Sequence, residues 1–491
     1  MNTMFKRKWK FILAWMLLFV FAINQAVPAM AATEEVTEPT IKATYRVLNQ
    51  KATVTYEVNS EVKLKSVTYL QGLVTLENSI RWSVSGKKLS ESGSFDVKKS
   101  GYYTLRAEDV NGGVTLQNIY VDMEFKAVWI SYLEFKSTGY TKDEFEAQID
   151  EMFDNVVDMG MNAVIVHVRP FGDAMYDSSY FPWSKYISGT QGKDPGFDPL
   201  EYMVEAAHDR GLQFHAWLNP YRVTTKNTDV KTLAANNPAR KWLTDKKTAN
   251  DRNVLSFDGN LYYNPAVTEV RTLIRNGVLE IVQNYDVDGI HFDDYFYPTL
   301  GSNYEKIFDA PEYKTYVASC KAHGEKILPI DEWRRQNVNL LVKGIYSEIK
   351  NENPDVVFGI SPGGFLDTLR MKDRYYVDVD RWLSEPGYVD YICPQLYWSF
   401  EHKQYPFDGI LNRWLELRKN TDVNVYVGIP VYKSASNDEP DFKKNANILA
   451  DMIKTCRDTK LVDGYMFFRY DNFYSNTAQK AVNNLLKVLN K

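Results

Sequence analysis

The chain has 491 residues, of which 44% are hydrophobic and 25% charged, a balance that excludes wholesale disorder and provides enough apolar residues for a large core. Its net charge is −5, and removal of the four basic residues of the N-terminal leader leaves 54 basic against 63 acidic residues, which disfavours nucleic-acid binding. The aromatic fraction of 14%, with 33 Tyr and 11 Trp, suits a protein that stacks side chains on sugar rings as well as filling a core.

Residues 1–31 predict a signal peptide. Four basic residues precede an apolar run over 11–23, and a small-x-small cleavage signal ends at Ala31. A membrane span needs roughly 20 apolar residues, so this shorter run favours cleavage over retention as an anchor. No Cys follows the cleavage position, which excludes a lipoprotein. We expect a secreted or cell-wall-associated protein without an integral membrane segment after cleavage.

Three cysteines occur in the chain, Cys320, Cys393 and Cys456, and no two of them form a CxxC motif. An odd and low count in an exported protein of this size indicates that no disulfide framework holds the fold. The hydrophobic core must therefore stabilise the protein. Cys393 lies in an apolar, strand-like run and is expected to be a packing residue.

Residues 32–40 are a short linker, and residues 41–123 predict a small all-β module. Apolar and polar residues alternate over 52–58, 62–69, 101–107 and 114–120, as in half-buried strands. Turn signals such as Asn111-Gly112-Gly113 separate these runs at the spacing of an antiparallel sandwich. The final hairpin of the module loosely resembles that of bacterial immunoglobulin-like modules. Its role stays open between a spacer or brace and a glycan- or wall-binding module.

From Phe125 onward the pattern changes, and residues 124–491 predict one α/β domain. Strand-like apolar runs cover 126–132, 162–168, 213–218, 289–293, 356–361, 388–397, 423–429 and 464–469. Helical patterns follow over 142–159, 198–210, 267–284, 332–352, 378–385, 407–419, 441–459 and 474–490. Eight strand-helix units with near-continuous apolar strands indicate a (β/α)8 TIM barrel. A doubly wound open sheet is disfavoured because no Gly-rich phosphate turn follows the first strand.

The site of such a barrel is built where the strands end, so the polar and aromatic residues that follow each strand are the candidates. The predicted substrate-binding residues are Arg169, Asp173, His215, Asn219, Arg222, Tyr295, Gln395, Tyr397, Trp398, Tyr432, Lys433 and Arg469. Acids that protonate a glycosidic oxygen, donors for hydroxyl groups and flat rings for stacking are what a hydrolase of sugar polymers requires. We therefore predict a polysaccharide substrate.

The strongest local signal is the segment 288–298, which contains two adjacent carboxylates. Side chains alternate along a strand, so Asp293 and Tyr295 share the inward face, while Asp294 takes the other unless the strand has ended. Asp293 is the first candidate for a catalytic carboxylate, with Asp294 beside it. The structural alternative is that these carboxylates cap the following segment or pair with Arg222 or Arg334.

A second catalytic carboxylate is expected across the mouth of the barrel. Asp471 follows the last strand and is the predicted residue, although a salt bridge with Arg469 or Lys433 would explain it equally well. Three other carboxylates compete for the role: Glu401, Asp173 and Glu134. A separation of about 5 Å between the two carboxyl groups would imply retention of configuration, and roughly 6.5 to 9.5 Å inversion.

Three histidines, His167, His215 and His291, lie on neighbouring predicted strands, and with Asp293 they suggest a metal-dependent glycan deacetylase as an alternative. No HxH or HxxxH pairing exists, so core or substrate-contacting histidines are favoured and no metal or other cofactor is predicted. A non-catalytic carbohydrate-binding barrel is a third alternative. Two adjacent acids at the mouth argue against it, since binding alone does not need them.

Several longer strings give a more specific signal: VRPFGDAMY (168–176), FPWS (181–184), FDPL (197–200), HAWLNPYR (215–222), HFDDY (291–295), WRRQNV (333–338), FGISP (358–362) and PQLYW (394–398). Together they resemble the glycosyl hydrolase-like 10 family of bacterial barrels, over residues 125–490. The resemblance implies an exported enzyme that hydrolyses glycosidic bonds, with the glycan strand of peptidoglycan as the expected substrate. It does not identify the catalytic pair.

Segment 288–298 is also similar to the fourth strand of chitinase-type barrels, but Tyr295 stands where those enzymes have their acid Glu, so their mechanism is not carried over. An insertion over 299–331 follows this strand. It is long for a plain connection, which predicts a lid or a groove wall.

Overall fold

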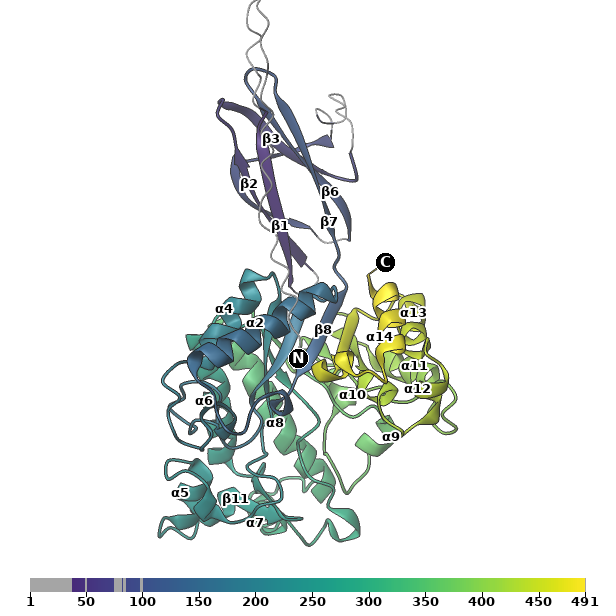
Figure 1. Ribbon diagram of the computed structural model, residues 1–491. Coiled ribbons are helices and arrows are strands. Elements are labelled where there is room, and N and C mark those ends of the chain that lie inside the picture. The colour runs from purple at the N-terminus through teal and green to yellow at the C-terminus, as the bar shows by residue number, and fades with distance from the viewer. Residues whose placement is uncertain (1–37, 49–50, 75–81, 83–84, 98–99, 491) are drawn as a thin grey trace, which may run out of the picture.

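The computed structural model describes residues 38–48, 51–74, 82, 85–97 and 100–490 (Figure 1). The predicted signal peptide and most of the predicted linker lie outside the described residues. The described chain consists of an N-terminal β-module and a large barrel (Figure 1). Within this part of the chain, none of the helices combines the length and the apolar character needed to cross a membrane.

Two antiparallel sheets make up the N-terminal module. The first has the order β1-β2-β5, with β1 (Thr40–Leu48), β2 (Lys51–Asn59) and β5 (Ser92–Val97). The second has the order β4-β3-β6-β7, with β4 (Lys87–Leu89), β3 (Leu64–Gln71), β6 (Gly101–Asp109) and β7 (Val114–Val121). Val54, Tyr56 and Leu105 belong to the shared core between them. The four alternating runs correspond to β2, β3, β6 and β7. Strand β1 was not predicted, although Ile41, Ala43 and Tyr45 alternate with polar residues along it and contribute to the same core.

Eight parallel strands form a closed barrel. They are β8 (Phe125–Ile130), β9 (Ala163–Arg169), β10 (Gln213–Leu218), β13 (Gly289–Phe292), β14 (Val357–Ile360), β15 (Tyr391–Ile392), β16 (Asn424–Pro430) and β17 (Gly464–Phe468). The barrel closes because β8 pairs with β9 on one side and with β17 on the other. The predicted TIM barrel is confirmed.

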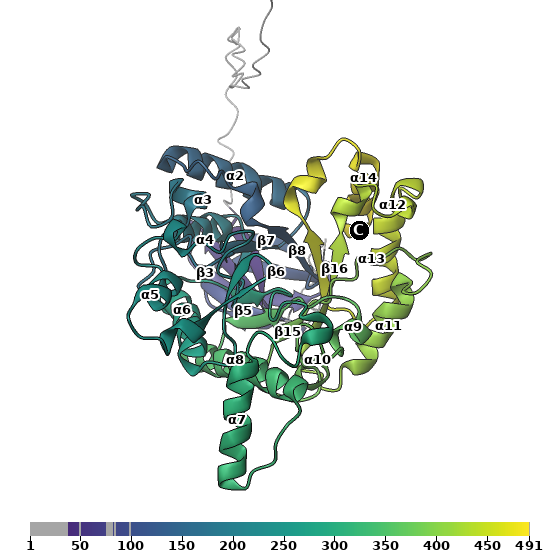
Figure 2. The same cartoon turned by 90° about the horizontal axis from the view of Figure 1, so that it is seen from below.

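Helices surround the barrel strands (Figure 2). Those after the strands are α2 (Lys142–Asp158), α3 (Lys185–Ser188), α4 (Pro199–Asp209), α6 (Thr268–Asn284), α8 (Ile330–Glu352), α9 (Leu366–Leu369), α10 (Val379–Trp382), α11 (Phe407–Leu417), α12 (Pro440–Lys444), α13 (Ile448–Thr459) and α14 (Gln479–Leu489). Helix α2 begins at a capping box in which Thr141 and Glu144 satisfy each other's backbone N–H groups. The predicted helix 441–459 is in fact two helices, α12 and α13, because the chain leaves the helical conformation after Lys444.

The interior of the barrel is packed with side chains. Along β8, Phe125, Ala127 and Trp129 belong to the interior cluster, whereas Val128 and Ile130 belong to the core between strands and helices. This alternation follows from the period of two in a strand. Cys393 lies in the same interior cluster, as its apolar surroundings in the sequence predict. The packed interior therefore leaves no room for a ligand between these side chains, and the cavity of the barrel lies where the strands end.

Two insertions enlarge the end of the barrel at which the strands finish. After β10 come helix α5 (Pro238–Thr244) and a hairpin of β11 (Val254–Phe257) and β12 (Asn260–Tyr263). After β13 comes α7 (Ala310–His323), which projects outward from the barrel (Figure 2). Arg252 and Glu312 join the two insertions through an ion pair of 2.7 Å. The insertion after β13 thus extends a wall of the barrel.

The β-module lies at the opposite end of the barrel from these insertions (Figure 1). Arg46 of β1 forms a salt bridge with the buried carboxylate of Asp288, and its guanidinium lies 3.2 Å from His208 Nε2. Asp288 immediately precedes β13, whereas Asp293 immediately follows it. The module therefore contacts the end at which the strands begin, and among the described residues the opposite end is built by the barrel domain.

Candidate active site

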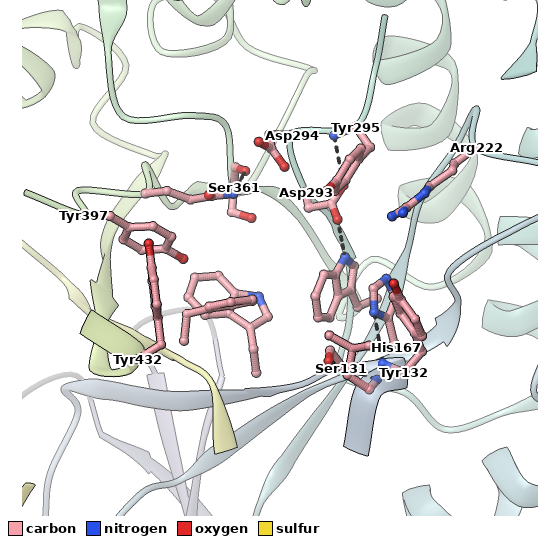
Figure 3. A pocket seen from close by; sticks show the side chains of 15 residues that line it. Ser131, Tyr132, His167, Arg222, Asp293, Asp294, Tyr295, Ser361, Tyr397 and Tyr432 are labelled. Carbon is pink, nitrogen blue, oxygen red and sulfur yellow. Dashed lines mark hydrogen bonds between the residues drawn. The ribbon is translucent and has the colours of Figure 1, made fainter. Parts of the chain in front are cut away.

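A cavity of about 240 Å³ opens at the end of the barrel where the strands finish (Figure 3). It is lined by Trp129, Ser131, Tyr132, Leu133, His167, Trp217, Arg222, Asp293, Asp294, Tyr295, Ser361, Gln395, Tyr397, Tyr432 and Phe468. Trp and Tyr rings make up much of this wall, so the cavity offers flat apolar surfaces beside a small number of polar groups. Asp293 and Asp294 are the two carboxylates among these lining residues. This composition is typical of a site for a sugar.

Asp293 is held in a defined orientation at the end of β13. Its Oδ2 accepts a hydrogen bond of 3.1 Å from Trp217 Nε1, and its Oδ1 accepts one of 3.0 Å from the Tyr295 backbone N–H. The side chain has only 3% of its surface exposed. Burial and the neighbouring Asp294 carboxylate raise the pKa of Asp293 well above its usual value, against the opposing effect of its hydrogen bonds and of Arg222. Asp293 can therefore carry a proton at a pH where an ordinary Asp is ionised.

Asp294 lines the same cavity although it is the next residue in the chain (Figure 3). Strict alternation would direct it outward, but β13 ends at Phe292, so the alternation stops before the two carboxylates. Burial raises the pKa of Asp294, while a hydrogen bond with Gln395 and the charge of Arg222 favour its ionised form. The two carboxylates thus differ in environment. Together the two carboxylates can hold a proton at a pH where ordinary Asp side chains are ionised.

Arg222 presents a cation to the cavity. Its guanidinium carbon lies 4.8 Å from the centroid of the Phe171 ring and 4.5 Å from that of Tyr295, so the group is held between two aromatic rings. It makes no hydrogen bond or ion pair through its side chain with any residue that the structure describes. The N–H donors of Arg222 are therefore available to an anionic group in the cavity.

Two of the three histidines belong to a hydrogen-bonded chain inside the barrel. Trp129 Nε1, which can only donate, lies 3.2 Å from His291 Nε2, so the proton of His291 is on Nδ1 and points to the Tyr391 hydroxyl at 3.0 Å. That hydroxyl then donates to His215 Nδ1 at 3.0 Å, and His215 Nε2 lies 3.3 Å from Gln213 Oε1. Burial lowers the pKa of His215 to about 3 and that of His291 well below its usual value, so both rings are neutral.

The third histidine, His167, is also neutral and bonded. Its Nδ1 accepts from the Tyr132 backbone N–H at 3.4 Å, and its Nε2 donates to Asn219 Oδ1 at 3.2 Å. Its ring stacks on that of Trp217 with the centroids 3.4 Å apart. Over the residues described, no group of three or more His, Cys, Asp or Glu side chains is placed to hold a metal ion. The histidines instead support the aromatic wall that orients Asp293.

Five predicted substrate-binding residues line the cavity: Arg222, Tyr295, Gln395, Tyr397 and Tyr432. The other seven lie outside it. Two of these, Arg169 and Asp173, are buried in the fold. Arg169 is fully buried with its guanidinium 4.5 Å from the centroid of the Phe181 ring, and Asp173 accepts a hydrogen bond of 2.9 Å from Gln191. His215 and Asn219 are buried in the hydrogen bonds just described. None of these four side chains is placed to contact a ligand in the cavity.

Trp398, Lys433 and Arg469 also lie outside the cavity, because neighbouring loops engage them. The Trp398 ring stacks on Phe365 with the centroids 3.5 Å apart, and Lys433 pairs with Glu439 at 2.7 Å. Arg469 pairs with two other carboxylates, Glu134 and Asp471. The ion pair that the sequence offered as the alternative for Asp471 is therefore present in the structure.

None of the four carboxylates considered as the second catalytic group lines the cavity, although Glu134 accepts a hydrogen bond of 2.7 Å from the lining residue Ser131. Asp471 is half exposed in its ion pair of 2.9 Å with Arg469, and Glu134 is buried on the other side of that arginine. Glu401 is exposed in a turn, and Asp173 is enclosed below the wall. The structure thus brings Asp294, and none of these four, next to Asp293.

Sequence reasoning missed several lining residues, among them Trp129, Tyr132 and Phe468. Trp129 and Phe468 occupy the ends of β8 and β17, and the alternation along those strands was a signal that could have identified them. Trp217 belongs to the interior cluster of the barrel. It is buried, with 5% of its surface exposed, yet it also lines the cavity and donates to Asp293.

Comparisons with known proteins agree with this architecture. The family model described as glycosyl hydrolase-like 10 matches residues 124–444. Glycosyl hydrolase YngK of Bacillus subtilis (strain 168) is 38% identical over 381 residues, which cover 74% of this chain and 71% of that relative. Glycosyl hydrolase DigH of Escherichia coli (strain K12) is 33% identical over 375 residues, which cover 71% of this chain and 80% of that relative.

Solved structures include a similar barrel. The glycoside hydrolase domain of PgaB (BpsB) from Bordetella bronchiseptica aligns with a TM-score of 0.51 at 13% identity, over 75% of this chain and 99% of that one, which shows a shared fold. The family match and the curated relatives confirm the resemblance found in the sequence and support a glycosidase. The chain belongs to the glycosyl hydrolase-like 10 family.

Proposed function

We propose that this glycosidase is exported and hydrolyses a β-linked glycan that contains N-acetylhexosamine, namely the glycan strand of peptidoglycan. The observation that carries the proposal is the pair of adjacent carboxylates, Asp293 and Asp294, in a cavity walled by Trp and Tyr rings. The predicted signal peptide supports a substrate outside the cytoplasm. The relatives' names support hydrolysis of glycosidic bonds.

Asp293 is the proposed general acid. Its raised pKa keeps the proton that the leaving glycosidic oxygen requires, and Trp217 fixes its orientation. Asp294 is the proposed ionised partner, because Gln395 and Arg222 both favour its charged form. A carboxylate in that position stabilises the positive charge that develops on the sugar ring in an oxocarbenium-like transition state. Different environments can separate the pKa values of two neighbouring acids, so that one donates a proton while the other stays ionised.

Arg222 supports an acidic glycan as the substrate. Its guanidinium is held between Phe171 and Tyr295 without an anionic partner of its own among the described residues, so it can bind a carboxylate of the substrate. The muramic acid residues of peptidoglycan strands without their stem peptides carry such a carboxylate on a lactyl ether, whereas chitin carries none. Tyr295, Gln395, Tyr397 and Tyr432 complete the proposed binding wall for sugar hydroxyls and ring faces.

We expect the purified protein, after treatment with a chelator, to cleave isolated peptidoglycan glycan strands into shorter oligosaccharides. The reason is that acid catalysis by Asp293 and Asp294 needs no metal ion. Mass spectrometry of the products is the measurement. Shorter chains with their acetyl groups intact would support the proposal. Loss of activity that zinc alone restores, with deacetylated and uncleaved polymer as the product, would support the deacetylase instead, and unchanged polymer would support a binding protein.

Arg222→Gln is expected to lower kcat/KM on muramic-acid-containing strands by roughly tenfold to a hundredfold, the range of a lost hydrogen bond to a charged group. The same variant should lose less on chito-oligosaccharides of equal length, which have no carboxylate to bind, so that the loss there reports only the effect of Arg222 on Asp293 and Asp294. Arg222→Lys is the matched control, which keeps the charge and should keep part of the preference. Equal losses on both substrates would refute recognition of a substrate carboxylate by Arg222.

A further inference from the structure

A second cleft, of about 900 Å³, lies between the β-module and the barrel. Module residues Ser100, Tyr102 and Tyr120 line one side of it, and barrel residues that include Lys126 and Arg457 line the other. Lys126 is the second residue of β8, so this cleft lies at the end where the barrel strands begin. It is therefore separate from the cavity that contains Asp293 and Asp294.

Two exposed aromatic rings form the module side of the cleft. Tyr102 of β6 and Tyr120 of β7 are direct partners in the sheet register, and their ring centroids lie 5.0 Å apart in an edge-to-face arrangement. Tyr102 is 44% exposed and Tyr120 is 51% exposed, whereas the neighbouring Tyr103 is buried in the module core. Neither Tyr102 nor Tyr120 has a hydrogen bond from its hydroxyl to a described residue. A pair of large rings left in contact with water beside a cleft marks a binding surface.

The charged groups that line the cleft are paired with one another. Lys126 Nζ lies 2.6 Å from Asp122 Oδ2, and Arg457 donates two hydrogen bonds to Glu124, at 2.9 and 2.6 Å. Glu124 also accepts a hydrogen bond of 2.9 Å from the Tyr465 hydroxyl. The lining residues that the structure describes therefore offer polar atoms for hydrogen bonds but no unpaired charge, in contrast to Arg222 in the active-site cavity. This balance suits an uncharged ligand rich in hydroxyl groups.

We propose that this cleft is a second glycan-binding site, which holds an uncharged sugar residue of the polysaccharide, such as N-acetylglucosamine, with its pyranose ring against Tyr102 and Tyr120. The apolar C–H face of a pyranose covers the exposed rings, and its hydroxyls reach the paired polar groups of Asp122, Glu124 and Arg457. Because the site lies at the other end of the barrel, the segment held there is not the segment being cleaved. The site retains the enzyme on an insoluble polymer while the cavity acts on another stretch of it.

The test measures binding of the full chain to insoluble chitin, an uncharged N-acetylglucosamine polymer. Every protein compared carries Asp293→Asn, so that turnover does not remove the polymer. Adding Tyr102→Ala and Tyr120→Ala should weaken binding by roughly tenfold, since two stacking contacts are lost. Adding Tyr180→Ala, which removes an exposed tyrosine ring outside the cleft lining, is the matched control and should leave binding unchanged. In the chain with Asp293 intact, the two cleft substitutions should leave the rate on short soluble oligosaccharides unchanged.

Unchanged retention on chitin in the Tyr102→Ala, Tyr120→Ala variant would overturn the proposal. So would a change in the monomer-dimer equilibrium by analytical ultracentrifugation without a change in retention, because the two rings would then belong to a contact between copies of the chain. Tyr120→Thr alone, which keeps a residue suited to a strand, repeats the test if the double variant fails to fold. Binding is measured here without turnover, so failure of the proposed hydrolytic activity would not be mistaken for failure of this site.

Discussion

Asp293→Asn is expected to lower turnover on glycan strands by at least about a hundredfold, the lower end of the contribution of a general acid. Asn is close in shape to Asp, so the fold should be unchanged, but its single amide oxygen can accept only one of the two hydrogen bonds, from Trp217 or from the Tyr295 backbone. It cannot supply the proton. An aryl glycoside whose phenol leaves without protonation should therefore keep a much larger fraction of its rate in this variant. Steady-state kinetics on the two substrates is the measurement.

The pH dependence gives a second readout of the same role. The pKa of Asp293 is raised by burial and by Asp294, so the protonated acid persists to a higher pH than for an ordinary Asp, and the rate falls as the pH rises through that pKa. In Asp293→Asn this alkaline fall should disappear from the residual activity. If the variant keeps the same alkaline limb, the titrating acid is another group.

Asp471→Asn is the matched control, because it applies the same substitution to a carboxylate that is tied to Arg469 outside the cavity. It should keep near-normal turnover. Asp294→Asn should lose activity on both the glycan and the aryl glycoside, since charge stabilisation does not depend on the leaving group. A nearly normal Asp293→Asn enzyme together with an Asp294→Asn enzyme that is rescued by the aryl substrate would show that the two roles are exchanged.

Arg334→Met is expected to give the largest loss of stability, about 3–5 kcal/mol, because it leaves Asp309 buried without its cation. Both side chains are fully buried, and Arg334 Nε donates to Asp309 at 2.8 Å. Asp309 also accepts from the Tyr297 hydroxyl at 2.8 Å, so the pair anchors the segment that follows the two active-site carboxylates. Denaturant unfolding followed by fluorescence measures the change.

Two further variants test whether the loss of stability comes from the unpaired Asp309 carboxylate or from the removal of any arginine. Arg370→Met removes an exposed ion pair with Asp380 and should change the free energy of unfolding by no more than about 1 kcal/mol. The double variant Arg334→Met, Asp309→Leu removes both charges and should recover most of the loss, because no unpaired charge remains buried. A double variant as unstable as Arg334→Met would mean that packing, and not the unpaired carboxylate, causes the loss.

The architecture of the barrel was predictable because it depends on local patterns. Apolar runs such as 162–168 and 213–218 have the length of strands covered on both faces, and the helical patterns between them have the period of one apolar face. The capping residues Thr141 and Asp198 mark the starts of α2 and α4 in the sequence itself. The split between α12 and α13 was not predicted, since the apolar pattern continues across the break.

Part of the active site was predictable for the same reason. Asp293 and Tyr295 were placed at the mouth by alternation along one strand, and Arg222, Gln395, Tyr397 and Tyr432 by their position just after strands. The position of Asp294 depended on where β13 ends, which is at Phe292. That boundary is set by pairing with β10 and β14, and a single sequence does not specify it to one residue.

What the sequence determined by itself was the order of strands and helices, the end of the barrel at which the candidate site lies, and the residue types gathered there. The tertiary structure decided which of those residues turn inward. Trp398 and Arg469 follow strands just as Tyr397 does, yet one stacks on Phe365 and the other pairs with Glu134. Beyond the last backbone hydrogen bond that pairs a strand with its neighbour, side chains no longer alternate between two faces. Their direction is then decided by packing against residues that are distant in the sequence.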